Sequence, residues 1–202
     1  MTQLEIMGAN AKNASVFLRT AGSKKDDALL AIAKALREHS DEIIKANEID
    51  IENGKNAGLT ESLLDRLRLT PERINGMAEG VEQVAALADP IGNVLEGRTL
   101  KNGLNIEKVR VPMGVIGIIF EARPNVTSDA AALCLKAGSA VILRGGKEAI
   151  NSNLAVSEIM RNAVESVGFP KDCIALVKDT SRQSATELMQ LSDYLDVLIP
   201  RG

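Results

Sequence analysis

Two cations separated by two glycines, Arg144-Gly145-Gly146-Lys147, stand at the end of an apolar run that begins at Ala140. Glycine lets the backbone approach an anion closely, and the cationic side chains supply the charge that binds it. A helix that begins just after such a turn also directs free N–H groups toward the anion. The G-x-G-x-x-G and P-loop patterns are both absent here. The residues therefore leave two interpretations open, a nucleotide-phosphate site and a solvated turn.

A second group of polar residues, Glu121-Ala122-Arg123-Pro124-Asn125, follows the apolar run at 114–120. Open parallel sheets bind ligands at the carboxyl ends of their strands, so this loop is a further candidate for a ligand site. Glu121 and Asp129 could transfer protons by their positions. A lone carboxylate near a helix start is more often a cap or an ion-pair partner.

Reactive side chains are few. His39 is the only histidine, and its place at the end of a predicted helix favours a surface role. Cys134 lies in a very apolar helical segment and Cys173 precedes a predicted buried strand, so both are predicted core thiols. The two cysteines form no disulfide framework, which favours a reducing cytoplasm, and no residues have metal-ligand spacing. We expect a ligand site without a reactive group and without a metal.

Residues 1–90 carry apolar side chains at helical spacing. Ser23 and Asp26 have the spacing of a capping box, in which each side chain binds the other residue's backbone N–H. Thr70 followed by Pro71 is typical of another helix start. This segment is therefore predicted to be an array of amphipathic helices.

The pattern changes after residue 90. Asn102-Gly103 between residues 94–101 and 104–111 predicts a β-hairpin with a type I′ turn, in which both turn residues have positive φ. Apolar runs typical of buried parallel strands follow at 114–120, 140–144, 173–177 and 195–200. Helical segments are predicted between them at 127–137, 150–167 and 182–191. This alternation predicts βα units that build a parallel sheet.

Charge and composition exclude several classes of protein. The 202 residues carry a net charge of -3, which argues against a general binder of nucleic acid or of anionic membranes. With 45% hydrophobic and 25% charged residues, the composition is that of a soluble globular protein. No run approaches the roughly 20 apolar residues that span a bilayer. Neither nucleic acid nor membrane is an expected partner.

Three stretches are far more specific than these patterns. They are LLDRLRLTPERINGMAEGVEQVAAL, LKNGLNIEKVRVPMGVIGIIFEARPNVTSDAAALCLKAGSAVILRGGKEAINSN and DVLIPRG. Together they resemble the N-terminal part of the gamma-glutamyl phosphate reductases, the proline-biosynthetic members of the aldehyde dehydrogenase superfamily. The resemblance covers essentially the whole chain. It implies an α/β fold in which a helical segment (1–90) and a β-hairpin (91–112) lead into a Rossmann-like parallel sheet of βα units (113–202), incomplete at the C-terminus.

The resemblance also implies an activity. Enzymes of this family use NADPH to reduce L-glutamyl 5-phosphate to L-glutamate 5-semialdehyde, with release of phosphate. A cysteine thiolate displaces the phosphate, and a hydride then reduces the thioester. Neither Cys134 nor Cys173 matches this nucleophile, which is expected beyond Gly202. The chain is therefore expected to be a catalytically incomplete fragment.

Site residues follow from the same resemblance. Arg144 takes the position that reaches the adenosine ribose, and Lys147 is a natural partner for the 2′-phosphate of NADPH. Asn125 is the candidate donor to a developing oxyanion, and Arg123 the candidate for holding a substrate anion. The residues assigned to the cofactor are Arg144, Gly145, Gly146, Lys147, Arg201 and Gly202.

The partners implied are the substrate L-glutamyl 5-phosphate, a homo-oligomer and glutamate 5-kinase, in the cytoplasm. The hairpin at 94–111 resembles the element that pairs subunits in this superfamily. Two alternatives stay open. One is a different acyl-phosphate or aldehyde dehydrogenase, and the other is a nucleotide-binding module without catalysis.

Overall fold

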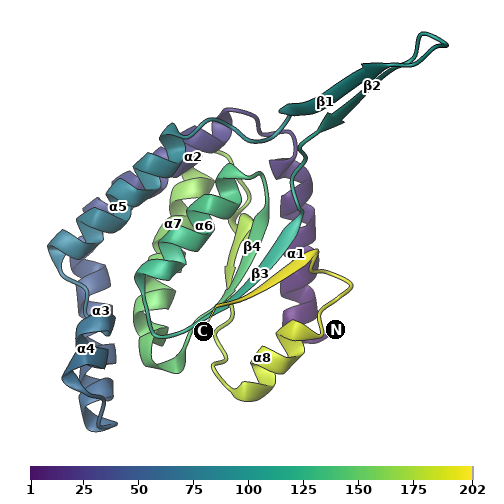
Figure 1. Ribbon diagram of the computed structural model, residues 1–202. Coiled ribbons are helices and arrows are strands. Elements are labelled where there is room, and N and C mark those ends of the chain that lie inside the picture. Colours follow the sequence, from purple (N-terminus) through teal and green to yellow (C-terminus); the bar gives the residue numbers. More distant parts are fainter. Residues whose placement is uncertain (202) are drawn as a thin grey trace.

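A group of helices precedes the first strand in the computed structural model, which describes residues 1–201 (Figure 1). Thr70 caps one of them, because its hydroxyl accepts a hydrogen bond from the N–H of Arg73 (3.2 Å), and Pro71 occupies the first turn. The helical array predicted for this part of the chain is confirmed. Its members are α1 (Gln3–Leu18), α2 (Lys24–Glu38), α3 (Ser40–Asn56), α4 (Glu61–Leu67) and α5 (Pro71–Ala86).

The capping box predicted at the start of α2 is wrong. Ser23 precedes the helix, but its hydroxyl makes no capping hydrogen bond. The carboxylate of Asp26 instead accepts a hydrogen bond from Nζ of Lys136 at 2.6 Å. Lys136 is 4% exposed, and a buried ammonium group needs an anionic partner. The carboxylate of Asp26 is therefore paired with Lys136 and is not used to cap the start of α2.

The hairpin consists of β1 (Val94–Thr99) and β2 (Asn105–Val109), paired antiparallel and projecting from the rest of the chain (Figure 1). Its turn is not type I′, because Gly103 has a φ of +85° while every non-glycine residue described has a negative φ. The carbonyl of Leu100 accepts from the N–H of Gly103, and Leu104 N–H donates to Oδ1 of Asn102. These bonds make a three-residue loop with glycine in the left-handed position.

The predicted α/β fold is confirmed. Four parallel strands form a sheet in the order β5-β4-β3-β6. The strands are β3 (Val115–Phe120), β4 (Ala140–Arg144), β5 (Ile174–Leu176) and β6 (Val197–Arg201). The helices between them are α6 (Asn125–Lys136), α7 (Ile150–Ser166) and α8 (Arg182–Met189), with short 3-10 turns η1 (Lys147–Ala149) and η2 (Lys171–Cys173).

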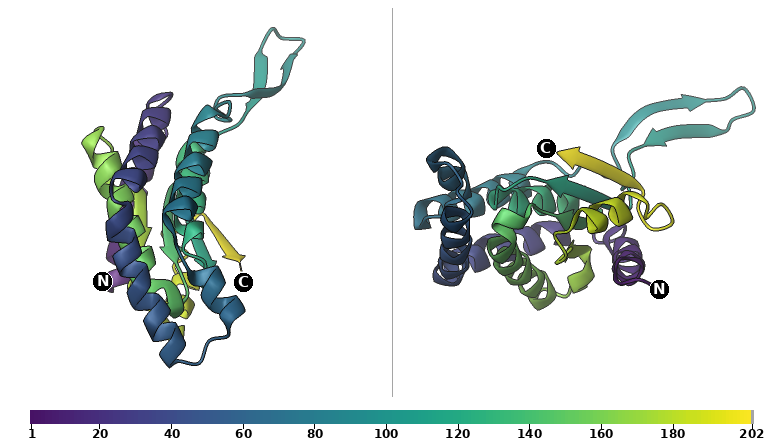
Figure 2. Two further views of the ribbon diagram at one scale, coloured as in Figure 1. Left: turned by 90° about the vertical axis from the view of Figure 1, so that its left-hand side faces the viewer. Right: turned by 90° about the horizontal axis from the view of Figure 1, so that it is seen from below.

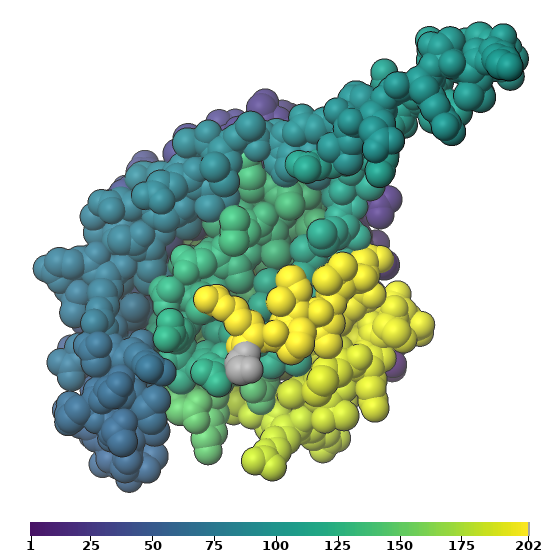
Figure 3. Space-filling view, viewed as in Figure 1, coloured from purple at the N-terminus to yellow at the C-terminus, as the bar shows by residue number. Residues whose placement is uncertain are grey.

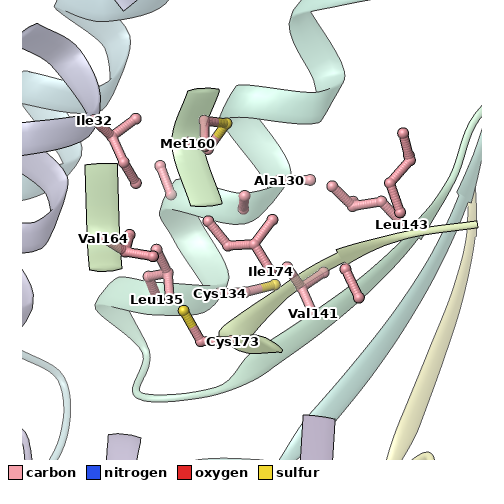
Figure 4. Packing of buried hydrophobic residues seen from close by; sticks show 14 of the residues in the cluster. Ile32, Ala130, Cys134, Leu135, Val141, Leu143, Met160, Val164, Cys173 and Ile174 are labelled. Carbon is pink, nitrogen blue, oxygen red and sulfur yellow. The ribbon is translucent and has the colours of Figure 1, made fainter. Parts of the chain in front are cut away.

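Helices cover both faces of the sheet. Helices α6 and α7 lie on one face, with α2 and α5 packed outside them, and α1 lies on the other face (Figures 1 and 2). The first four residues of β4 are completely buried, and burial of each large aliphatic side chain contributes about 1.5 to 3 kcal/mol. Figure 4 shows the sulfur atoms of Cys134 and Cys173 inside this core. No helix in residues 1–201 has the length and hydrophobicity to cross a bilayer.

The strand order reverses next to β3. Strands β4 and β5 lie on one side of β3, and β6 lies on the other. Asp196, the residue before β6, fixes the position of this strand. The Asp196 carboxylate accepts hydrogen bonds from Nζ of Lys12 (2.8 Å) and from the N–H of Val115 (2.8 Å). Where the order of a parallel sheet reverses, the connections diverge and leave a crevice at the carboxyl ends of the strands. In this chain the crevice lies at the ends of β3 and β6.

Candidate functional site

A cavity of about 560 Å³ lies at this crevice. The ends of β3, β4 and β6 and the loops after β3 and β4 form one part of its wall, and α4 with the preceding Leu59 forms another. Figure 3 shows the blue residues around α4 and the yellow residues of β6 on opposite sides of the same face. The cavity is lined by Leu59, Leu63, Arg66, Leu67, Ile119, Phe120, Glu121, Ala122, Arg123, Arg144, Gly146, Glu148, Pro200 and Arg201.

The structure brings three predicted cations, Arg123, Arg144 and Arg201, to this one cavity. They come from the ends of three strands, because the carboxyl ends of parallel strands meet at one edge of the sheet. Arg201 pairs in register with Phe120 of β3 and is exposed. Gly202 lies outside the described residues.

The two glycines after β4 are required by packing within the chain. A Cβ at Gly145 would lie 2.3 Å from Nδ2 of Asn153, and one at Gly146 would lie 3.2 Å from the backbone N of Ala122. Neither glycine has a positive φ. Close approach to Asn153 of α7 thus explains Gly145, and close approach to the loop at Ala122 explains Gly146, a packing role that the sequence alone did not indicate.

Arg144 also has a structural partner. Its Nη2 donates to the carbonyl oxygens of Thr180 (2.7 Å) and Ser181 (3.0 Å), in the loop between β5 and α8. Its Nε is buried and has no hydrogen-bond partner within residues 1–201. The guanidinium group therefore holds one wall of the crevice and still has a free donor. This loop contact was not predicted.

Lys147 is exposed at the start of η1 and has no carboxylate within 4 Å in the described chain. It does not line the 560 Å³ cavity. Its ammonium group is therefore available to a ligand that extends out of the cavity past the end of β4.

A second cavity of about 410 Å³ adjoins the first, because Arg66 and Arg123 line both. It contains the predicted Asn125 together with Asp129, which sequence reasoning had considered for proton transfer. Sequence reasoning missed the arginines of the α4 region. The sequence shows only that Arg66 and Arg68 alternate with Leu67 and Leu69, and the structure makes the two arginines exposed and the two leucines buried. The lining residues are Asp65, Arg66, Arg68, Leu69, Arg73, Gly76, Met77, Arg123, Asn125 and Asp129.

Asn125 and Asp129 form a polar pair on the first turns of α6. Nδ2 of Asn125 donates to Oδ2 of Asp129 at 3.0 Å. Burial raises the pKa of Asp129, and the hydrogen bond from Asn125 and the charge of Arg201 oppose the increase. An amide NH₂ group has two donors, so Asn125 keeps one for a further acceptor.

Neither cysteine suits nucleophilic catalysis. Burial raises the pKa of both Cys134 and Cys173 to about 12, so almost no thiolate is present at neutral pH. Both are buried, and neither lines either of the two cavities. The prediction that these are core thiols is confirmed.

A parallel sheet with its crevice at the strand reversal, lined by cations and glycine, defines a dinucleotide-binding fold of the Rossmann type. Residues 2–197 match the family described as "Aldehyde dehydrogenase family", and the chain belongs to this family.

Individual relatives agree with this membership. Gamma-glutamyl phosphate reductase from Clostridium beijerinckii is 54% identical, in a match that covers 100% of this chain and 49% of the relative. The crystal structure of the protein of that name from Thermotoga maritima superposes with a TM-score of 0.97 at 40% identity, covering 100% of this chain and 49% of the other. That from Saccharomyces cerevisiae has a TM-score of 0.92 at 34% identity, covering 100% and 52%. The chain spans about half the length of the curated relatives it matches.

Proposed function

We propose that this chain forms the cofactor-binding half of a gamma-glutamyl phosphate reductase. The reaction converts L-glutamyl 5-phosphate, NADPH and a proton into L-glutamate 5-semialdehyde, NADP⁺ and phosphate. The observation that carries the proposal is the 54% identity, over the whole chain, to a relative of that name. The fold alone would not select this substrate, because one fold serves many reactions.

The residues at the crevice fit a phosphorylated dinucleotide. Arg144, Lys147 and Arg201 are cations around it, and Nε of Arg144 is a buried donor without a partner in residues 1–201. In this proposal Arg144 and Lys147 hold the ribose that carries the 2′-phosphate, and the turn at Gly145-Gly146 lies beside them. Arg201 and Gly202 begin the loop that meets the pyrophosphate. When bound, NADPH supplies the hydride.

The second loop of the crevice serves the substrate in this proposal. Arg123 binds a substrate anion through its guanidinium group. The free amide N–H of Asn125 donates to the carbonyl oxygen of the substrate as negative charge develops there. The nucleophilic cysteine is assigned to residues outside 1–202, since Cys134 and Cys173 are buried thiols.

Assembly and location belong to the same proposal. The projecting hairpin β1–β2 pairs subunits of a homo-oligomer, and exposed apolar residues such as Val94, Leu95 and Ile106 support this role. Glutamate 5-kinase is the proposed partner enzyme, and the cytoplasm is the proposed location.

The test uses the intact protein that contains these residues and measures the reverse reaction. NADP⁺ should be reduced in the presence of L-glutamate 5-semialdehyde only when inorganic phosphate is added, because phosphate is the group that releases the acyl chain. Reduction that proceeds equally without phosphate would contradict the proposal and favour an ordinary aldehyde dehydrogenase.

The same assay tests the cofactor residues. Lys147→Gln should lower kcat/KM for NADP⁺ by about tenfold or more and that for NAD⁺ by less than about threefold, because only NADP⁺ carries the 2′-phosphate. Lys55→Gln, at an exposed lysine of α3, is the matched control. Arg144 is a poorer probe, because its replacement also releases the loop at Thr180. Equal losses of kcat/KM with NADP⁺ and NAD⁺ would contradict the proposal that Lys147 binds the 2′-phosphate.

A further inference from the structure

The second cavity holds several cations without anionic partners. Arg66, Arg68 and Arg123 line it, and in residues 1–201 none has a carboxylate within 4 Å or donates a hydrogen bond through its side chain. Arg73, on the same wall, is different. Its guanidinium group pairs with Asp65 at 2.9 Å and donates to the carbonyl oxygen of Arg68 at 2.8 Å. The chain therefore satisfies Arg73 and leaves three guanidinium groups of this cavity free for a ligand.

One carboxylate in the same cavity also lacks an ion-pair partner. Asp129 is partly buried on α6, and no cation lies within 4 Å of it in the described chain. Asn125 donates to Oδ2, while Oδ1 accepts no hydrogen bond within residues 1–201. A Cβ at Gly80 of α5 would lie 4.0 Å from Oδ1, so the glycine leaves space on that side. The charge of Arg201 offsets only part of the cost of burying this carboxylate, and a positively charged ligand group in direct contact with it would reduce the cost further.

The combination of three free cations and one free carboxylate selects a class of ligand. A simple phosphate or a dicarboxylate would leave the carboxylate of Asp129 facing like charge. A ligand that carries anionic groups together with an ammonium group would pair with all of them. The proposed substrate has this chemistry, since L-glutamyl 5-phosphate carries a phosphate, a carboxylate and an ammonium group.

We propose that the 410 Å³ cavity is the substrate chamber, in which Asp129 binds the ammonium group of an amino-acid acyl phosphate and Arg68 binds its carboxylate. This assignment rests on the proposed function. Arg68 and Asp129 line only the second cavity, which suits two groups attached to the same carbon atom. Arg66 and Arg123 line both cavities, so they receive the phosphate end of the substrate, next to the cofactor site. Asp129 is thus a specificity-determining residue for an α-amino group.

The experiment compares three aldehydes in the phosphate-dependent reverse assay of the intact protein. L-glutamate 5-semialdehyde has both charged groups, 5-oxopentanoate lacks the ammonium group, and 4-aminobutanal lacks the carboxylate. Asp129→Asn should lower kcat/KM about tenfold or more for L-glutamate 5-semialdehyde and for 4-aminobutanal, and change it less than about threefold for 5-oxopentanoate. Arg68→Gln should have the complementary pattern, with losses only for the two aldehydes that carry a carboxylate.

The controls separate this assignment from the proposed function and from folding. Asp41→Asn makes the same chemical change at an exposed site on α3 and should leave all three rates unchanged. A wild-type protein inactive with all three aldehydes would overturn the proposed function and the assignment together. A phosphate-dependent wild-type enzyme in which Asp129→Asn affects all three aldehydes alike would overturn only the assignment of Asp129. The Arg68→Gln pattern tests the chamber independently, because Arg68 is exposed and its replacement leaves the core intact.

Discussion

Two carboxylates in different parts of the molecule have opposite surroundings. Asp50 of α3 is 1% exposed and accepts four hydrogen bonds from two residues of α7. Its donors are the backbone N–H groups of Asn151 and Ser152, the Asn151 amide (2.8 Å) and the Ser152 hydroxyl (2.6 Å). Asp129 accepts one hydrogen bond, from Asn125. The first carboxylate is satisfied within the chain, and the second is left partly unsatisfied at a cavity.

The two carboxylates differ because different numbers of hydrogen-bond donors surround them. The first N–H groups of a helix have no partner inside it, and Asp50 provides the acceptor for the start of α7. Asn47 of α3 adds to this contact between α3 and α7, because its amide donates to the Leu67 carbonyl (2.8 Å) and to the Ser152 hydroxyl (3.0 Å). Complete satisfaction is typical of a scaffold, whereas incomplete satisfaction beside a cavity is typical of a binding site.

Asp50→Asn should have the largest effect on stability. The substitution removes the charge that four donors share and places an amide NH₂ group among N–H groups, so the free energy of unfolding should fall by about 2 to 4 kcal/mol. Urea unfolding would measure it. Asp41→Asn on the exposed surface of α3 should change stability by less than about 0.5 kcal/mol. Equal, small effects of the two substitutions would remove the distinction between scaffold and surface carboxylates.

Gly145→Ala should have the next largest effect. A Cβ would lie 2.3 Å from Nδ2 of Asn153 and 3.1 Å from the Phe120 ring, and such overpacking costs about 1 to 3 kcal/mol. Gly76 of α5 is the matched control, since a Cβ there meets nothing within 4 Å and Gly76→Ala should stabilise the helix by about 0.5 to 1 kcal/mol. A stable Gly145→Ala variant would show that this glycine is kept for ligand approach rather than for packing.

Asp129→Asn should have the smallest effect on stability, and in the opposite direction to Asp50→Asn. Burial raises the folded-state pKa of Asp129 above its ordinary value of 3.8, so the folded state favours the protonated carboxyl. The stability contributed by this side chain is full below pH 3.8 and is lost as the pH rises through the raised folded-state pKa. The asparagine variant should therefore be more stable than wild type at neutral pH, and the difference should vanish in acid. Urea unfolding at several pH values would show it, and a variant less stable than wild type at neutral pH would contradict the interpretation of Asp129.

Much of the fold was predictable because its signals are local. The apolar run 140–144 became β4 with the same bounds, and the helix predicted at 150–167 is α7 (Ile150–Ser166). The hairpin was also predicted, but its turn was not, since Asn102 uses its side chain to bind Leu104 N–H and keeps a negative φ. Side-chain bonds of this kind compete with the backbone geometry that the dipeptide favours.

The candidate site was predictable only in part. Arg123 and Arg144 were expected from the ends of two predicted strands and Arg201 from the family resemblance, and the parallel sheet brings all three to one cavity. Arg66 and Arg68 were missed because α4 precedes the sheet by many residues and reaches the cavity only through packing.

By itself the amino-acid sequence determined the order and type of the elements, because apolar periodicity, glycine and proline act over a few residues. Only the tertiary structure decided which charges are paired. Asp26 meets Lys136 across 110 residues and Asp50 meets Ser152 across 102, and no local pattern encodes which helix faces will come together. The same packing leaves the carboxylate of Asp129, beside the second cavity, without an ion-pair partner in residues 1–201. Burial makes that unpaired charge costly, and so the fold rather than the sequence pattern is the basis for proposing Asp129 as a binding group.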